Sequence, residues 1–153
     1  MAVNFELITE LQTLVRRDFV VASTVNVKAT DTNPLIAGEF LILNTSYQLA
    51  RPAADNGIAW AVHMEKGRYD VQALRKTDVL FSGGYEADTT VFTTAGITTI
   101  GQALGSDVAV AAPTGETGTK SGLKLFAAGV TLGYVTRLPA NNGGRLRFFQ
   151  TWA

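Results

Sequence analysis

The sequence predicts an all-β protein, and three features support this. Apolar and polar side chains alternate over short stretches, most clearly at 58–64 and 145–148, and such alternation places every second residue on the same face of a strand. Glycine, proline and asparagine punctuate the chain at 31–34, 51–57 and 141–144, where turns need them. Hydrophobic residues make up 46% of the chain and charged residues 17%, which is a globular composition. We therefore expect a single compact β-barrel or jelly-roll-like sandwich of about ten short antiparallel strands.

Residues 1–21 are expected to form an N-terminal arm, followed by a β domain at 22–153. Phe5, Ile8 and Leu11 recur at intervals of three residues, a spacing compatible with a short amphipathic helix. A strand is the alternative, because Phe19 and the two valines after it favour extended structure. Both alternatives stay open on the sequence alone.

Within the β domain, each expected strand is a short run of β-favouring residues that ends at a turn signal. In chain order these runs are 24–29, 39–44, 58–64, 70–74, 78–81, 89–93, 107–111, 123–127, 131–136 and 145–151. The Asn-Asn-Gly-Gly run at 141–144 is the best hairpin signal, because asparagine and glycine tolerate the positive φ of tight turns.

Charge and composition exclude several classes of function. Basic and acidic residues number 13 each, so we expect no nucleic-acid partner. The absence of cysteine excludes disulfides and thiolate nucleophiles. No apolar run approaches the roughly 18 residues of a membrane span, and the N-terminus does not resemble a signal peptide. Zero net charge also leaves little repulsion between identical copies.

One loop, Gly115–Ser121, superficially resembles a phosphate-binding loop. A P-loop needs a glycine directly before its lysine and another glycine five positions earlier. Here Thr119 and Thr114 occupy those positions. The residues that follow are glycines and β-formers where a P-loop would begin its helix. We therefore predict a flexible hairpin loop and no cofactor.

Groups that could carry out catalysis are sparse. His63 is the only histidine, and we predict that it is a surface or interface residue. Acidic residues in the middle of the chain are predicted to lie on loops and solvent faces: Glu65, Asp70, Asp78, Glu86 and Asp88. We expect no enzymatic activity, no catalytic residue and no metal site.

Aromatic residues are concentrated at the C-terminus, where Phe148, Phe149 and Trp152 fall within the last six residues. Phe148 and Phe149 must point to opposite faces of a strand. One of them therefore either lies at an interface or packs under a second layer, and both alternatives stay open.

Three stretches of the chain, Pro34–Leu41, Val79–Asp88 and Gly133–Phe148, resemble the capsid decoration (cement) proteins of tailed bacteriophages. The resemblance is one of style and layout and covers residues 20–153. It implies a β module without enzymatic activity on the outer capsid surface of the virion, made in the bacterial host cytoplasm. It also implies a homotrimer that binds the major capsid protein and stabilises contacts between neighbouring capsomers, with no membrane or nucleic-acid partner.

Position along the chain indicates two contact surfaces for such a role. An extended arm can add to a neighbour's sheet or lie in a groove, so we expect capsid contacts from Phe5, Leu7, Ile8, Leu11, Arg16 and Arg17. Apolar side chains of a C-terminal hairpin suit a symmetric interface, so we expect oligomer contacts from Tyr134, Phe149 and Trp152.

Two other functions remain as alternatives. Another β-rich virion component, such as a tail-tube or connector subunit, would form rings. A small carbohydrate-binding or hydrolytic jelly roll would use an aromatic residue such as Trp60 or Trp152.

Overall fold

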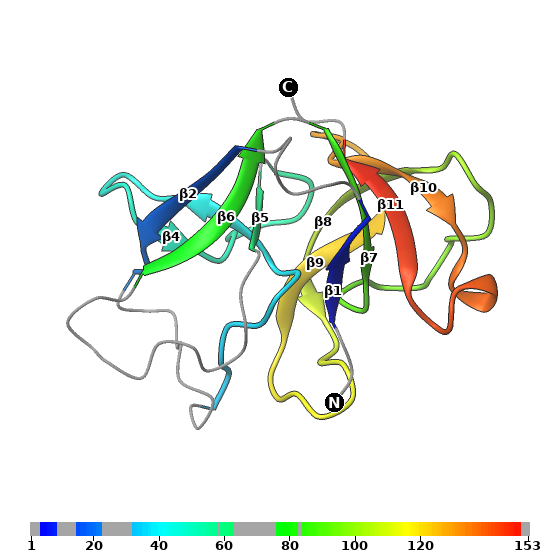
Figure 1. The fold of residues 1–153 in the computed structure, drawn as a ribbon, viewed down its shortest axis with the longest axis horizontal. Coiled ribbons are helices and arrows are strands. Elements are labelled where there is room, and N and C mark those ends of the chain that lie inside the picture. Colours follow the sequence, from blue (N-terminus) through cyan, green and yellow to red (C-terminus); the bar gives the residue numbers. More distant parts are fainter. Residues whose placement is uncertain are drawn as a thin grey trace.

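A computed structural model describes residues 4–8, 15–22, 32–57, 59–62, 76–82 and 84–150, and for the strands at 15–19, 60–62 and 76–82 it describes the backbone only. The described chain is all-β, as predicted, apart from a short 3-10 helix at Pro139–Asn141 (Figure 1). Two predicted strands, 24–29 and 70–74, lie outside the described residues, as do His63, Leu11 and Trp152.

The larger of two sheets has six antiparallel strands in the order β1-β7-β11-β10-β8-β9. The strands are β1 (Phe5–Leu7), β7 (Tyr85–Thr89), β8 (Ala103–Val110), β9 (Lys120–Leu125), β10 (Gly133–Arg137) and β11 (Leu146–Gln150). The predicted hairpin turn at 141–144 lies between β10 and β11, which pair directly.

The second sheet has five antiparallel strands in the order β2-β6-β5-β3-β4. The strands are β2 (Val15–Val20), β3 (Phe40–Leu43), β4 (Leu49–Ala50), β5 (Trp60–Val62) and β6 (Lys76–Ser82). In Figure 1 the labelled strands of this sheet lie beside the larger sheet.

In each sheet a single parallel bridge links two strands that are not neighbours in the strand order. Phe92, just beyond β7, bridges Leu123 in β9, and Val21, just beyond β2, bridges Leu49 in β4. Across the described residues, neither strand order closes through a continuous ladder. Of the two predicted architectures, a β-barrel or a jelly-roll-like sandwich, a closed barrel is therefore not observed in this part of the chain.

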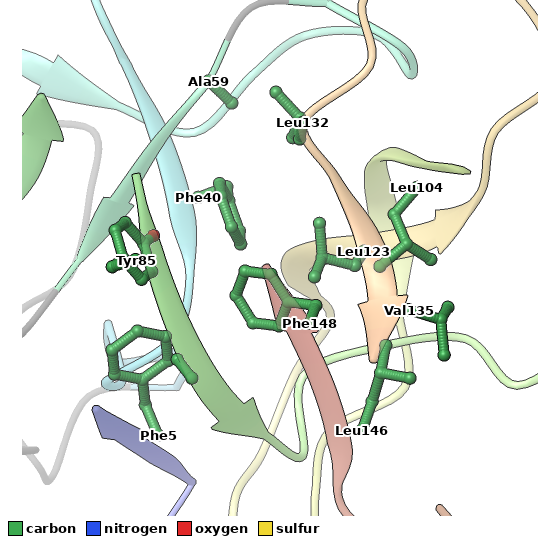
Figure 2. Packing of buried hydrophobic residues seen from close by; sticks show 11 residues of the cluster. Phe5, Phe40, Ala59, Tyr85, Leu104, Leu123, Leu132, Val135, Leu146 and Phe148 are labelled. Carbon is green, nitrogen blue, oxygen red and sulfur yellow. The ribbon is translucent and has the colours of Figure 1, made fainter. Parts of the chain in front are cut away.

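One apolar core is shared by both sheets. Phe40 of the five-stranded sheet and Phe148 of the six-stranded sheet are both buried, with ring centroids 6.1 Å apart. Figure 2 shows these two rings next to each other, with Tyr85 beside them. The Tyr85 ring also lies edge-on to Phe148 and to Phe5, at 6.1 and 6.3 Å. Burial of such aromatic rings contributes a large share of core stability.

The described parts of the N-terminal segment are strands, so the strand alternative holds for Phe5–Leu7 and Val15–Val20. Both strands belong to the sheets, because β1 pairs with β7 and β2 pairs with β6. Phe5 is only 7% exposed and packs in the shared core. The described part of this segment is thus built into the β body, which corrects the expectation of a separate arm there.

The predicted strand at 89–93 is wrong in its position, since the strand of this region is β7, at Tyr85–Thr89. The backbone leaves the β7 ladder after Thr89, whose hydroxyl accepts a hydrogen bond from the Val91 amide at 3.0 Å. Val91 and Thr93 then bond to Leu123 of β9 instead. The apolar residues of this run are buried by a turn towards another strand, which alternation alone does not reveal.

Candidate interaction surface

A row of exposed apolar side chains crosses the outer face of the six-stranded sheet. Tyr134 of β10 and Phe149 of β11 are directly opposite each other, and Glu86 of β7 is the next partner of Phe149. Ile8 continues the row beyond β1, because its amide donates to the Glu86 carbonyl at 2.8 Å. We call Ile8, Phe149 and Tyr134 the apolar row.

Alternation along the strands fixes the direction of these side chains. In β11, Leu146, Phe148 and Gln150 are buried, whereas Phe149 is 42% exposed. Tyr134 is also 42% exposed and Ile8 41%. Because adjacent strands are about 4.8 Å apart, the apolar row extends roughly 14 Å across the sheet. Single exposed apolar residues are ordinary, but an aligned set on a sheet is typical of a contact surface.

The Phe149 ring packs directly against the backbone of Gly84, where there is no side chain to keep it away. A Cβ atom at Gly84 would lie 3.0 Å from Cζ of Phe149 and 3.1 Å from the Gln150 carbonyl oxygen. The ring therefore covers the glycine backbone and has restricted freedom. Restricted aromatic side chains lose little entropy on association.

A second row, two residues along the strands, is ionic and internally balanced. Glu6, Asp88 and Arg147 are aligned across β1, β7 and β11. Arg147 donates to both carboxylate oxygens of Asp88, at 2.8 and 3.1 Å. Arg145 pairs with Glu6 at 2.8 Å and approaches Asp88 at 3.7 Å. Two acidic and two basic groups thus neutralise one another.

Asp88 is the buried centre of this ionic row. Its burial alone would raise the pKa of the carboxyl, but hydrogen bonds from Arg147 and Asn142, with the charges of Arg147 and Arg145, outweigh burial. The pKa of Asp88 is therefore held below its ordinary value, and the group stays charged. Glu6, Asp88, Arg145 and Arg147 have their partners within the molecule, so the apolar row, with Glu86 between Ile8 and Phe149, is the part of this face that we consider for contact.

The residues predicted from the sequence fall into different places. Phe149, Tyr134 and Ile8 come together in the apolar row, although Ile8 was assigned to the capsid surface and the other two to the oligomer interface. Leu7 is half-buried against the core, so it offers little surface, as does Phe5. The positions of Arg16 and Arg17 are in β2, opposite Leu80 and Val79 of β6.

The loop that resembles a phosphate-binding loop is a β8–β9 hairpin connection, as predicted. Gly115 and Gly118 have φ values of 85° and 79°, which glycine adopts without strain. Its lysine, Lys120, is completely buried and donates to Asn33 and to the Pro34 carbonyl. A buried lysine held in this way is not presented to a phosphate group.

Two exposed side chains were not singled out from the sequence. Tyr47 is 78% exposed in the turn between β3 and β4, and Ile100 is 62% exposed before β8. Neither lies on a strand, so strand alternation gave no signal for them.

Among the described residues, no group of three or more histidine, cysteine or acidic side chains is arranged to hold a metal ion. In the same part of the chain, no helix is long and apolar enough to cross a membrane.

Comparisons with known proteins give no relative: no family model, no curated protein and no solved structure matches the chain.

Proposed function

We propose that this chain is a structural virion protein that binds the outer surface of a mature phage head and stabilises contacts between neighbouring capsomers. The observation that carries the proposal is the apolar row, which offers a contact for assembly into a homotrimer and lies on the outer face of a sheet whose other face packs against the shared core. A β body with aligned, exposed apolar side chains on an outer sheet face suits a protein that works by docking.

The occupant that we assign to the apolar row is a second copy of this chain, in a homotrimer on the capsid. Two features favour a copy of the same protein. The chain has no net charge, and the ionic row next to the apolar row is balanced internally. Copies can therefore approach through this face without electrostatic repulsion. A three-fold arrangement repeats each small contact three times.

We assign the contact with the major capsid protein to the five-stranded sheet. Its strand β2 carries two adjacent arginines, Arg16 and Arg17, while the apolar row occupies the other sheet. The two sheets share one core, so the protein would present two contact surfaces on a single body. Bridging between capsomers needs such a body. A barrel-like or jelly-roll-like closure of the six-stranded sheet, completed through the bridge from Phe92 to Leu123, would serve the same purpose.

Binding to phage heads tests the function directly. Purified protein would be sedimented with expanded heads that lack it and, in parallel, with unexpanded procapsids. We expect saturable binding to expanded heads at a whole multiple of the lattice sites. Failure to bind either particle would contradict the proposal, and ring-shaped particles in solution would favour a tail-tube or connector subunit.

The oligomer interface has its own test. Replacing Tyr134 and Phe149 by serine is expected to lower the trimer fraction on heads and in solution, as measured by mass photometry. Tyr47→Ser is the matched control, because Tyr47 is a more exposed aromatic residue that lies outside the apolar row. Equal loss of trimer in both variants would contradict the assignment of the apolar row.

A further inference from the structure

A buried lysine and an asparagine carboxamide are in direct contact between the two sheets. Lys120, the first residue of β9, has no exposed surface. Its Nζ atom lies 2.8 Å from Oδ1 of Asn33, which is 87 residues earlier in the chain and precedes β3. Nζ also donates to the Pro34 carbonyl oxygen at 2.5 Å. The amine is thus held by the Asn33 carboxamide and by the backbone carbonyl of the next residue.

The Asn33 carboxamide is held in one orientation. Its Nδ2 donates to the Thr119 carbonyl oxygen at 2.9 Å, so the amide nitrogen points away from the lysine and the carbonyl points towards it. The Gly118 backbone packs closely against Asn33, because a Cβ atom there would lie 2.3 Å from Asn33 Cγ. Since a carbonyl bond is about 1.23 Å long, the lysine nitrogen lies within about 4 Å of the Asn33 carbonyl carbon.

A charge pair with a buried carboxylate fixes the surroundings of this contact. Glu39, also without exposed surface, accepts from Arg51 Nε at 2.8 Å and from the amide of Ser121, the neighbour of Lys120, at 3.1 Å. Arg51 in turn donates to the backbone carbonyl of Asn33 at 3.3 Å. Glu39 and Arg51 therefore act as positioning residues that tie both reacting segments to each other.

We propose that Lys120 and Asn33 form an intramolecular isopeptide bond. In this step the lysine nitrogen bonds to Asn33 Cγ, the bond from Cγ to Nδ2 breaks, and Nδ2 leaves as ammonia with a proton from the lysine nitrogen. No oxidant or co-reactant is needed. The fixed proximity of the buried amine and the carboxamide supplies the orientation that the free amide reaction lacks.

The bond would link the segment before β3 to the first residue of β9, and so join the two sheets covalently. It would close a loop of more than half the chain in a protein that has no cysteine for disulfides. A cross-link of this kind stabilises chiefly by restricting the unfolded chain. This inference does not depend on the proposed role in a virion.

Intact-mass spectrometry of the full chain tests the proposal. After prolonged incubation, the wild-type protein is expected to lack one ammonia, about 17 Da. Trypsin is expected to release residue 33 and residue 120 in one branched peptide, uncut after Lys120. The full sequence mass in the wild-type protein would overturn the proposal.

Variants separate this bond from another reaction with the same mass loss. Asn56 and Asn142 both precede glycine and could lose ammonia as succinimides. Lys120→Arg and Asn33→Ala are expected to restore the full sequence mass, whereas Lys124→Arg, which alters a partly exposed lysine paired with Asp55, is expected to retain the loss. Persistence of the loss in Lys120→Arg would overturn the proposal.

Discussion

Asp88 and Arg147 face each other across β7 and β11, and Arg147 Nε lies 2.8 Å from Asp88 Oδ1. Only 1% of the Asp88 side chain is exposed. Asn142 donates to the same oxygen at 2.9 Å and ties the β10–β11 turn to the ionic row. This carboxylate therefore joins two strands and a turn.

Replacing Asp88 by asparagine is expected to lower the free energy of unfolding by about 2–3 kcal/mol, because two arginines lose their buried counter-charge. Denaturant titration at neutral pH measures this loss. Glu86→Gln, on the same strand and side of the sheet, serves as the control and is expected to change stability much less. If Asp88→Asn left the free energy of unfolding unchanged, the ionic row would not be a stabilising element.

The Asp88 pair also predicts how stability depends on pH. The pKa of Asp88 is lowered in the folded protein, so its contribution is fully present above the unfolded pKa of about 3.9 and is lost as the pH falls towards the folded pKa. We expect the stability difference between wild type and Asp88→Asn to be constant at neutral pH and to shrink below about pH 4. A difference that grew on acidification would contradict the lowered pKa.

Gly122 allows β9 to approach the Val91 backbone. A Cβ atom at this position would lie 2.1 Å from the Val91 carbonyl oxygen, which accepts a hydrogen bond from the Leu123 amide. Gly122→Ala is therefore expected to destabilise the protein by roughly 2–4 kcal/mol.

Gly57→Ala is the matched control for this substitution. The nearest atom to a Cβ at Gly57 is the Ala54 carbonyl oxygen at 3.9 Å, so there is room for a methyl group. Thermal unfolding of both variants measures the contrast. Similar melting temperatures would show that β9 can move away from Val91 without cost.

Tyr47 has a backbone conformation that its side chain does not favour. Its φ is 57°, in the left-handed region where asparagine and glycine are preferred. The turn is maintained by Asn44, whose side chain accepts from the amides of Ser46 and Gln48, both at 2.9 Å. Since 78% of Tyr47 is exposed, little packing is lost on its removal.

Tyr47→Asn is therefore expected to raise the free energy of unfolding by about 0.5–1 kcal/mol. Asn44→Ala is expected to act in the opposite direction, because it removes both side-chain bonds that hold the turn. Chemical denaturation measures whether each substitution raises or lowers the free energy of unfolding. A loss of stability in Tyr47→Asn would indicate that the ring makes a contact worth more than the strain.

Local alternation and turn chemistry predicted the fold class and the positions of several strands, because each of these depends on neighbours in sequence. The hairpin of β10 and β11, with its turn at 141–144, is the clearest case. Alternation also predicted that Phe148 and Phe149 point to opposite faces, and the structure shows Phe148 buried and Phe149 exposed. Such features need no knowledge of distant contacts.

Features that depend on contacts between distant segments could not be predicted in this way. Ile8 joins the apolar row only because β1 pairs with β7, a register that the sequence does not reveal. The sequence predicted a loop position for Lys120, because its partner, Asn33, is 87 residues earlier in the chain. Buried polar clusters of this kind arise from tertiary packing and leave no periodic signal.

Tyr85 is buried in the shared core, and its hydroxyl finds no hydrogen-bond partner within the described chain. An unsatisfied buried hydroxyl is costly. Tyr85→Phe keeps the ring and its edge-on contacts with Phe5 and Phe148 while removing the polar atom. We therefore expect the variant to be more stable than wild type by about 1 kcal/mol at neutral pH.

The advantage of Tyr85→Phe is expected to increase at alkaline pH. Burial raises the pKa of the Tyr85 hydroxyl, so the folded protein keeps it neutral while the unfolded chain ionises it above about pH 10. Stability linked to this group is fully present below the unfolded pKa and is lost as the pH rises beyond it. Denaturation of both proteins at neutral and alkaline pH measures the change. A constant difference would mean that the hydroxyl ionises equally in both states, and that water reaches it through the core.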